Sequence, residues 1–114
     1  MCVPYIGDMA RFVHPAIADI ALPGLLSALA DPVRLDIVRK LYTAKNGLCC
    51  NDASPCRTLP KSTLSNHFRV LRESGLIRTK KHGLEHISQL RRTEIDGKFP
   101  GLLKLVLTLS GKER

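Results

Sequence analysis

The chain has 114 residues, 44% of them hydrophobic and 25% charged, and its formal net charge is +8. This length corresponds to a single domain. No stretch approaches the ~20 apolar residues of a membrane span, and prolines near the N-terminus interrupt any signal-peptide core. The sequence also lacks a phosphate-binding glycine loop, a nucleophile motif and a clustered carboxylate pair. We therefore expect a cytoplasmic protein that is not an enzyme.

The first thirty residues predict short N-terminal elements. Residues 1–15 are bounded by prolines and form either a flexible arm or a short helix. A helical run is expected over residues 16–22. Pro23 fits the first turn of the next helix, which is expected over residues 24–30. The apolar stripe of that helix consists of Leu25, Leu26 and Leu29.

Asp31 and Pro32 form a start signal for a helix over residues 33–43. Aspartate caps helix N-termini, and proline is suited to the first helical position. The residues predicted to face inward are Ile37, Val38, Leu41 and Tyr42.

Residues 48–59 form the least regular part of the chain. Pro55 interrupts any long helix there, so the segment predicts a short helix near residues 49–53 and a second turn near residues 56–59. This segment occupies the place of the first helix of a helix-turn-helix.

Residues 60–75 predict an amphipathic helix. Leu64, Phe68 and Leu71 recur at helical spacing, so they share one face and are assigned to the core. Ser62 is suited to capping the start of the helix. Gly75 is suited to ending it in the left-handed conformation.

Residues 76–90 predict two strands joined by a turn at His82 and Gly83. From Arg57 to His82 the chain has seven Lys or Arg residues and one acid, Glu73, so this segment carries about +6. A helix with a polar, basic face followed by a basic hairpin is the layout of a recognition helix and a wing. Such clustering fits a surface that faces phosphates, and the alternative is an ordinary solvated basic face.

The last helix is predicted over residues 100–109 and is apolar on nearly every side. A terminal helix of so small a domain cannot bury every side within its own chain. We therefore expect a second copy to cover one face and form a two-fold homodimer; the alternative is a terminal helix without a partner. The expected interface consists of Leu102, Leu103, Leu105, Val106 and Leu109.

Two segments resemble a known family. Residues 28–38, ALADPVRLDIV, resemble the Ala-Leu-Ala-Asp-Pro-x-Arg-Leu-x-Ile signature of ArsR/SmtB-type repressors. Residues 62–77, STLSNHFRVLRESGLI, are similar to the recognition helix of the same family. The resemblance covers residues 25–90. It implies a mainly α fold with a small β-hairpin wing, a winged helix-turn-helix that dimerises through terminal helices. It also implies a homodimer that represses an operator and releases it when an inducer binds.

The resemblance places the helix of residues 61–74 in the major groove of double-stranded DNA. Asn66 would pair with adenine, and Arg69 or Arg72 with guanine or phosphate. His67 is either a DNA contact or a half-buried packing residue. The wing would hold the DNA backbone or the minor groove through salt-sensitive contacts. The expected contact residues are Lys61, Ser62, Thr63, Ser65, Asn66, His67, Arg69, Arg72, Arg78, Lys80 and Lys81.

Three cysteines before the recognition helix are candidate inducer ligands. In the resemblance, Cys49, Cys50 and Cys56 lie where founding members carry a Cys-x-Cys site. Three thiolates suit a soft ion, such as the metalloids As(III) and Sb(III), mercury or cadmium. The first two cysteines are adjacent, so all three converge only if the backbone is not a continuous helix there. No cofactor is expected besides such an inducer.

Other uses of the thiols stay open. Cys50 and Cys56, or Cys2 with one of them, could form a reversible disulfide as a redox switch. The cysteines could also be inert packing residues. The family's second site, zinc ligands on the last helix, has no counterpart, because residues 95–109 contain Asp96 but no histidine. A further alternative for the whole chain is an adaptor that dimerises and binds an acidic protein.

Overall fold

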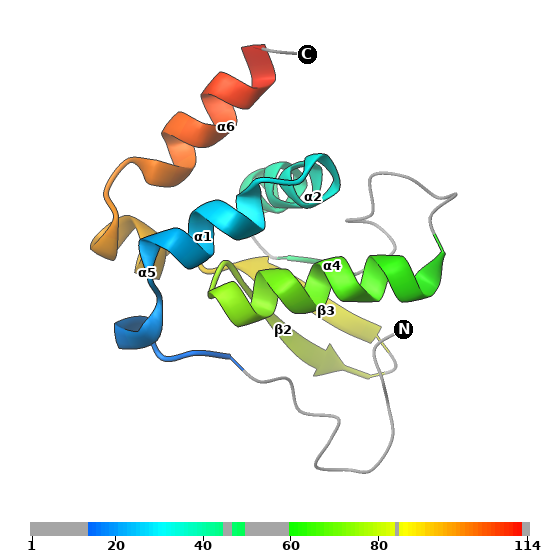
Figure 1. Cartoon of the computed structure of the whole chain (residues 1–114). Coiled ribbons are helices and arrows are strands. Elements are labelled where there is room, and N and C mark those ends of the chain that lie inside the picture. The colour runs from blue at the N-terminus through cyan, green and yellow to red at the C-terminus, as the bar shows by residue number, and fades with distance from the viewer. Residues whose placement is uncertain (1–13, 45–46, 50–59, 84, 113–114) are drawn as a thin grey trace.

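The structure, a computed structural model, describes residues 14–44, 47–49, 60–83 and 85–112. Helices and a small sheet follow one another along the chain (Figure 1). The elements are η2 (Ile17–Asp19), α1 (Leu22–Leu29), α2 (Pro32–Thr43), β1 (Leu48–Cys49), α4 (Lys61–Ser74), β2 (Ile77–His82), β3 (Glu85–Leu90), α5 (Arg92–Lys98) and α6 (Leu102–Lys112). The predicted class, mainly α with a β-hairpin wing, is confirmed.

The helix boundaries follow local capping chemistry at two of the expected places. The side chain of Asp31 accepts hydrogen bonds from the backbone N–H groups of Val33 and Arg34, and Pro32 is the first residue of α2. Gly75 ends α4 with φ of +94°. A Cβ at this position would lie 2.5 Å from Cγ1 of Ile20, so both the backbone angle and the packing require glycine.

Two expected boundaries are wrong. Ser62 does not cap α4, because the cap position belongs to Pro60 and no side chain bonds there. The helical run expected over residues 16–22 is reduced to the single turn η2. Ile20 is extended (φ −78°, ψ 119°) and its side chain is buried in the core, which ends the turn. Lys98 Nζ then donates to the carbonyl of Ile20 at 2.6 Å.

The sheet has three antiparallel strands in the order β1-β3-β2. The predicted hairpin is present, with Ile77 paired to Leu90. Gly83 lies in its turn as expected, whereas His82 is the last residue of β2 and pairs with Glu85. The strand β1 was not predicted. Its pairing with β3 places Cys49 in a strand, so the helix expected from residue 49 is wrong at that residue; residues 50–59 lie outside the described residues.

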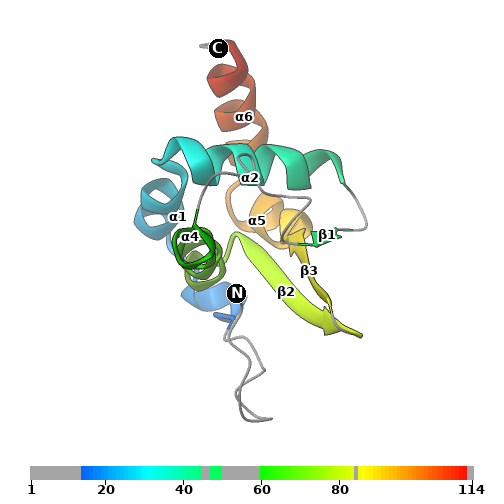
Figure 2. The same cartoon turned by 90° about the vertical axis from the view of Figure 1, so that its right-hand side faces the viewer.

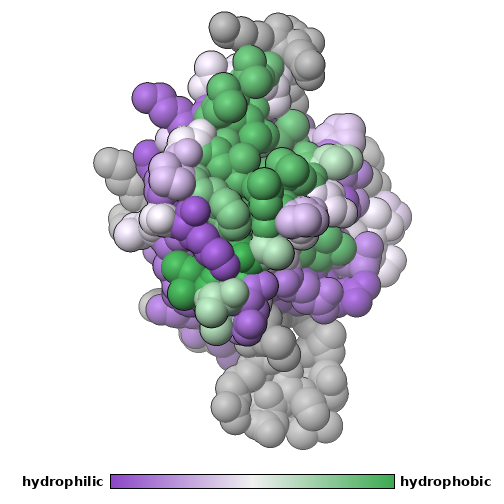
Figure 3. Space-filling view, turned by 60° about the vertical axis from the view of Figure 1, so that its left-hand side comes forward, coloured by the Kyte–Doolittle hydropathy of each residue, from purple (hydrophilic) through white to green (hydrophobic). Residues whose placement is uncertain are grey.

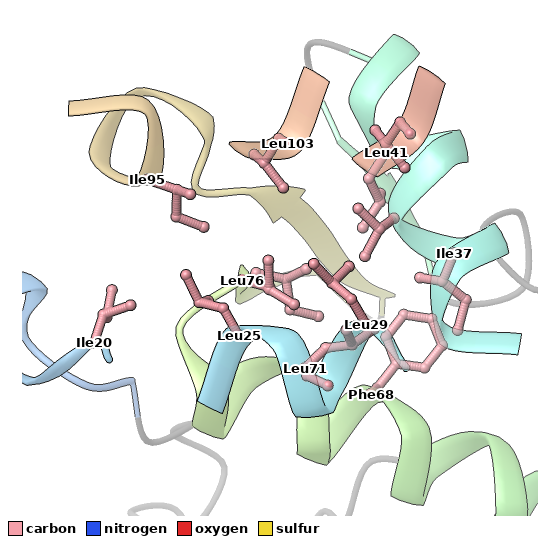
Figure 4. Packing of buried hydrophobic residues seen from close by; sticks show 14 residues of the cluster. Ile20, Leu25, Leu29, Ile37, Leu41, Phe68, Leu71, Leu76, Ile95 and Leu103 are labelled. Atoms are coloured by element: carbon pink, nitrogen blue, oxygen red, sulfur yellow. The ribbon is translucent and has the colours of Figure 1, made fainter. Parts of the chain in front are cut away.

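The core lies where α1, α2, α4, the base of the hairpin, α5 and α6 meet (Figure 4). Phe68 and Leu71 of α4 are fully buried there, as their spacing predicts, while Leu64 is partly buried. Among the inward residues predicted for α2, Ile37, Val38 and Leu41 are buried and Tyr42 is partly buried. The α4 helix is thus held against the body of the protein by one apolar face.

The helix α6 lies at the end of the molecule opposite the hairpin (Figures 1 and 2). Its Leu103 and Leu107 are buried in the core, whereas Leu105 and Leu109 are 58% and 51% exposed. The assignment of Leu103 to the dimer interface needs correction, because its side chain packs wholly within its own chain. Among the described residues, no helix is long and apolar enough to cross a membrane.

Candidate nucleic-acid interface

The N-terminal half of α4 presents a polar, basic surface. The side chains of Lys61, Ser62, Thr63 and Asn66 are exposed. Arg69 is exposed one turn further on, and its Nη2 donates to Oδ1 of Asn66. An amide and a guanidinium side by side on one helix face form a cluster of donors and acceptors of the kind that reads base edges.

Three other predicted contact residues of α4 are less accessible. The hydroxyl oxygen of Ser65 is buried, and Arg72 is half-buried. The side chain of His67 is only 13% exposed, and its Nδ1 lies 3.3 Å from Nη1 of Arg34. The predicted contact residues of α4 that are exposed are therefore fewer than the sequence pattern indicates: they are residues 61–63, 66 and 69, and the acidic Glu73 is exposed as well.

The wing carries its basic residues on both faces of the hairpin. Side chains alternate along a strand, so Arg78 and Lys80 share one face of β2 and Lys81 lies on the other. Lys80 and Lys81 are exposed near the turn. Arg78 is nearer the base of the hairpin, where its Nη2 lies 3.5 Å from Oε1 of Glu94.

A buried arginine, Arg91, fixes the base of the wing. Its side chain is 2% exposed; Nε donates to Oε1 of Glu94 at 2.7 Å, and Nη1 donates to the carbonyl of Pro15 at 2.8 Å. The hydrogen bond from Arg91 holds the pKa of the Glu94 carboxyl below its usual range, against a smaller opposing effect of burial. Sequence reasoning missed Arg91, because nothing in its neighbourhood indicates that this arginine is buried.

His14 joins the N-terminal segment to the outer edge of the wing. Its Nε2 accepts a hydrogen bond from the backbone N–H of Thr79 at 3.0 Å. Burial, with the nearby positive charges of Arg78, Arg72 and Arg91, lowers the pKa of His14. The neutral ring that this contact requires is thus favoured. Inside the hairpin, the hydroxyls of Thr79 and Ser88 are hydrogen-bonded at 2.9 Å and both are buried.

The candidate thiol ligands lie almost entirely outside the described residues. This is so for Cys50 and Cys56, while Cys49 has only its strand position in β1; Cys2, named for the alternative disulfide, also lies outside the described residues. The part of the chain that the structure describes contains no group of three or more His, Cys, Asp or Glu side chains that could hold a metal ion. The inducer site therefore stays a prediction.

Known proteins resemble this chain in both sequence and fold. A family model described as a helix-turn-helix domain matches residues 29–80. An HTH-type transcriptional regulator of Bacillus subtilis, YceK, is 35% identical over 80 residues, which cover 70% of this chain and 80% of that protein. The arsenical resistance operon repressor of Staphylococcus xylosus is 33% identical over 75 residues, covering 66% of this chain and 70% of that protein.

A solved structure agrees with these sequence matches. The transcriptional repressor PagR of Bacillus anthracis superposes with a TM-score of 0.56 at 31% identity, covering 74% of this chain and 90% of PagR. The helix-turn-helix match includes all of α4 and the first part of β2, where most of the exposed polar and basic side chains lie. The chain belongs to the ArsR/SmtB family of winged helix-turn-helix, DNA-binding transcriptional repressors.

Proposed function

We propose that the protein represses transcription as a homodimer that binds a two-fold-symmetric operator. The helix α4 enters the major groove, and Lys80 and Lys81 of the wing contact the sugar–phosphate backbone. The observation that carries this proposal is the exposed surface formed by Asn66, Arg69 and the first turn of α4 beside a basic hairpin. Half-sites about one turn of duplex apart fit two such helices related by a two-fold axis.

The apolar surface of α1 and α6 supports the homodimer. Leu22 and Leu26 of α1 are 40% and 46% exposed, and Leu105 and Leu109 of α6 are more than half exposed. Figure 3 shows hydrophobic side chains gathered in one patch on the face of the molecule that carries these helices. A large exposed apolar patch on a small protein is typical of an interface. In a two-fold dimer the same patch of each copy meets its equivalent.

The operator is found by selecting duplexes from a random-sequence pool with the unaltered protein. We expect the recovered sequences to be inverted repeats, and we expect their affinity to fall steeply as salt is raised. The adaptor alternative is favoured instead if no duplex is enriched, or if binding does not respond to salt.

Base reading and backbone binding are separated by comparing Asn66→Ala with Lys80→Ala. We expect Asn66→Ala to lose about 1–3 kcal/mol of binding free energy for the selected duplex, since a bidentate contact is removed. The base preference at one position of the duplex should be relaxed as well. We expect Lys80→Ala to lower the affinity for selected and random duplexes to the same extent. The salt slope, which is the slope of the logarithm of the binding constant against the logarithm of the salt concentration, should fall by about 1 in magnitude. Fluorescence anisotropy over a salt series measures both. Equal, sequence-independent losses in the two variants contradict the role given to Asn66.

The inducer that we propose is a thiophilic metalloid or metal ion held by Cys49, Cys50 and Cys56. Three thiolates form the soft, three-coordinate set that As(III) or Sb(III) favours. One relative of the chain, the Staphylococcus xylosus protein, is named an arsenical resistance operon repressor. At Cys49 the chain is a strand and not a helix. Successive side chains of a strand point to opposite faces, so a joint site with Cys50 requires the extended backbone to end at Cys49. A redox switch and a repressor without a thiol-based inducer are the alternative proposals.

Titration of the protein–duplex complex with arsenite, mercury or hydrogen peroxide tests the thiol site. We expect arsenite to release the parent protein from DNA, while Cys49→Ser, Cys50→Ser and Cys56→Ser stay bound, since each removes one ligand. Cys2→Ser is the matched control and should respond as the parent does. Release by peroxide alone favours the redox switch. Equal release of all variants rules out any thiol sensor.

A further inference from the structure

We propose that Arg34 and His67 are positioning residues for DNA binding. Their contact fixes the N-terminal half of α4 against α1 and α2, and His67 itself makes no contact with DNA. This inference rests on the proposed role of α4 as the helix that enters the major groove. It assigns His67 a different role from the DNA contact that the sequence pattern indicates.

Arg34 connects three helices although it belongs to the first turn of α2. Its Nε donates to the carbonyl of Ala28 at 2.7 Å, and its Nη2 reaches the carbonyl of Ser27 at 3.4 Å. These carbonyls lie in the last turn of α1, where helix carbonyls lack the usual i+4 partner, and the carbonyl of Ser27 also accepts the backbone N–H of Ala30 at 3.2 Å. The guanidinium is therefore held in place by α1 and contacts α4 from that fixed position.

The remaining nitrogen of Arg34 meets the recognition helix. Nη1 lies 3.3 Å from Nδ1 of His67. A guanidinium has donors and no acceptor, so this contact is a hydrogen bond in the tautomer whose Nδ1 carries no proton. Oδ2 of Asp31, the cap of α2, is 3.8 Å from the same Nδ1. The histidine thus faces a fixed pair of charged groups at the start of α2.

This contact lies at the end of the N-terminal half of α4, directly before the buried Phe68. The fully buried residues of α4, Phe68 and Leu71, are in its C-terminal half, whereas Leu64 is only partly buried. Apolar burial is non-directional, while a hydrogen bond requires one distance and one angle. The Arg34–His67 contact therefore fixes the rotation of α4 about its own axis, at the residue next to Asn66. Base reading requires side chains placed within about 0.5 Å.

A double-mutant cycle on the selected duplex tests the inference. Arg34→Met removes the donors and keeps the length of the side chain. His67→Phe keeps a ring without an acceptor, and His67→Asn places an amide oxygen near the position of Nδ1. We expect Arg34→Met and His67→Phe each to lower the affinity for the selected duplex by about 10- to 100-fold. This range corresponds to the loss of a hydrogen bond to a charged group. The double variant should bind the selected duplex no less tightly than the single variant with the larger loss, because both changes remove the same contact.

Two further readouts separate positioning from direct contact and from misfolding. We expect His67→Asn to bind within about threefold of the parent, because the acceptor is restored. Affinity for a random duplex and the salt slope should stay unchanged in all variants, since no phosphate contact is lost. Helix content by circular dichroism should also match that of the parent.

Several results overturn the inference. Additive losses in the double variant mean that Arg34 and His67 act independently. A lower salt slope for Arg34→Met means that Arg34 itself binds phosphate. A loss in His67→Asn equal to that of His67→Phe means that the acceptor has no role. Equal weakening of selected and random duplexes indicates a general folding defect. If the unaltered protein selects no duplex, the proposed function fails first and the inference fails with it.

Discussion

Replacing Leu105 and Leu109 together with lysine is expected to convert the proposed homodimer into a folded monomer and to weaken operator binding by about 10²–10⁴-fold. Both leucines lie on the exposed apolar face of α6, so charge there does not disturb the core. It does prevent two copies from burying this face against each other, because an unpaired ammonium is costly to desolvate. The loss follows from binding one half-site instead of two linked ones. Sedimentation velocity and anisotropy on the selected duplex measure the two effects.

Thr108→Lys is the matched control for this pair. Thr108 is also exposed on α6, but helical periodicity places it with Lys104 on a polar side of the helix. We expect this variant to remain dimeric and to bind DNA as the parent does. A parent protein that sediments as a monomer, or a double variant that still dimerises, places the interface elsewhere and contradicts the proposal for α6.

Phe68→Ala is expected to lower the free energy of unfolding by about 3–5 kcal/mol. Phe68 is fully buried and is the central apolar contact of α4 with the core (Figure 4). Truncation removes its buried surface and leaves a cavity that the surrounding helices cannot close. Chemical denaturation at one fixed protein concentration measures the loss, since the proposed dimerisation would make apparent stability depend on concentration.

The neighbouring residue provides the contrast. Arg69 is exposed, so Arg69→Ala should leave stability within about 0.5 kcal/mol of the parent and weaken DNA binding. Phe68→Leu, a milder change, should lose less stability than the alanine variant and keep base preference intact. A stability loss in Arg69→Ala comparable to that in Phe68→Ala contradicts the division of α4 into a core face and a DNA-facing side.

Local chemistry explains the elements that were predicted correctly. Asp31 and Pro32 start α2 because a cap and a fixed φ act within one turn of the chain. Gly75 ends α4 because a left-handed backbone angle favours glycine wherever it occurs. The hairpin also follows from neighbouring residues. These features depend only on residues within a few positions of one another, so they can be predicted from the sequence alone.

Elements that depend on distant partners were missed or misplaced. The two-residue strand β1 exists because β3, nearly forty residues later, offers an edge to pair with. Leu103 and Leu105 look equivalent in an apolar run, yet one is buried and the other exposed. The rotation of α6 against the core decides between them, and periodicity alone does not fix that rotation. The short turn η2 likewise ends because Ile20 is buried in the core.

The sequence by itself determined the fold class, the family and the stretch that carries the recognition helix and wing, because these follow from capping residues, periodicity and clustered charge. Only the tertiary structure decided which residues of that stretch face outward. It left Asn66 and Arg69 exposed, buried the hydroxyl of Ser65 and joined His67 to Arg34. The physical reason is that burial and hydrogen-bond partners arise where separate elements meet, and helical periodicity describes only one element at a time.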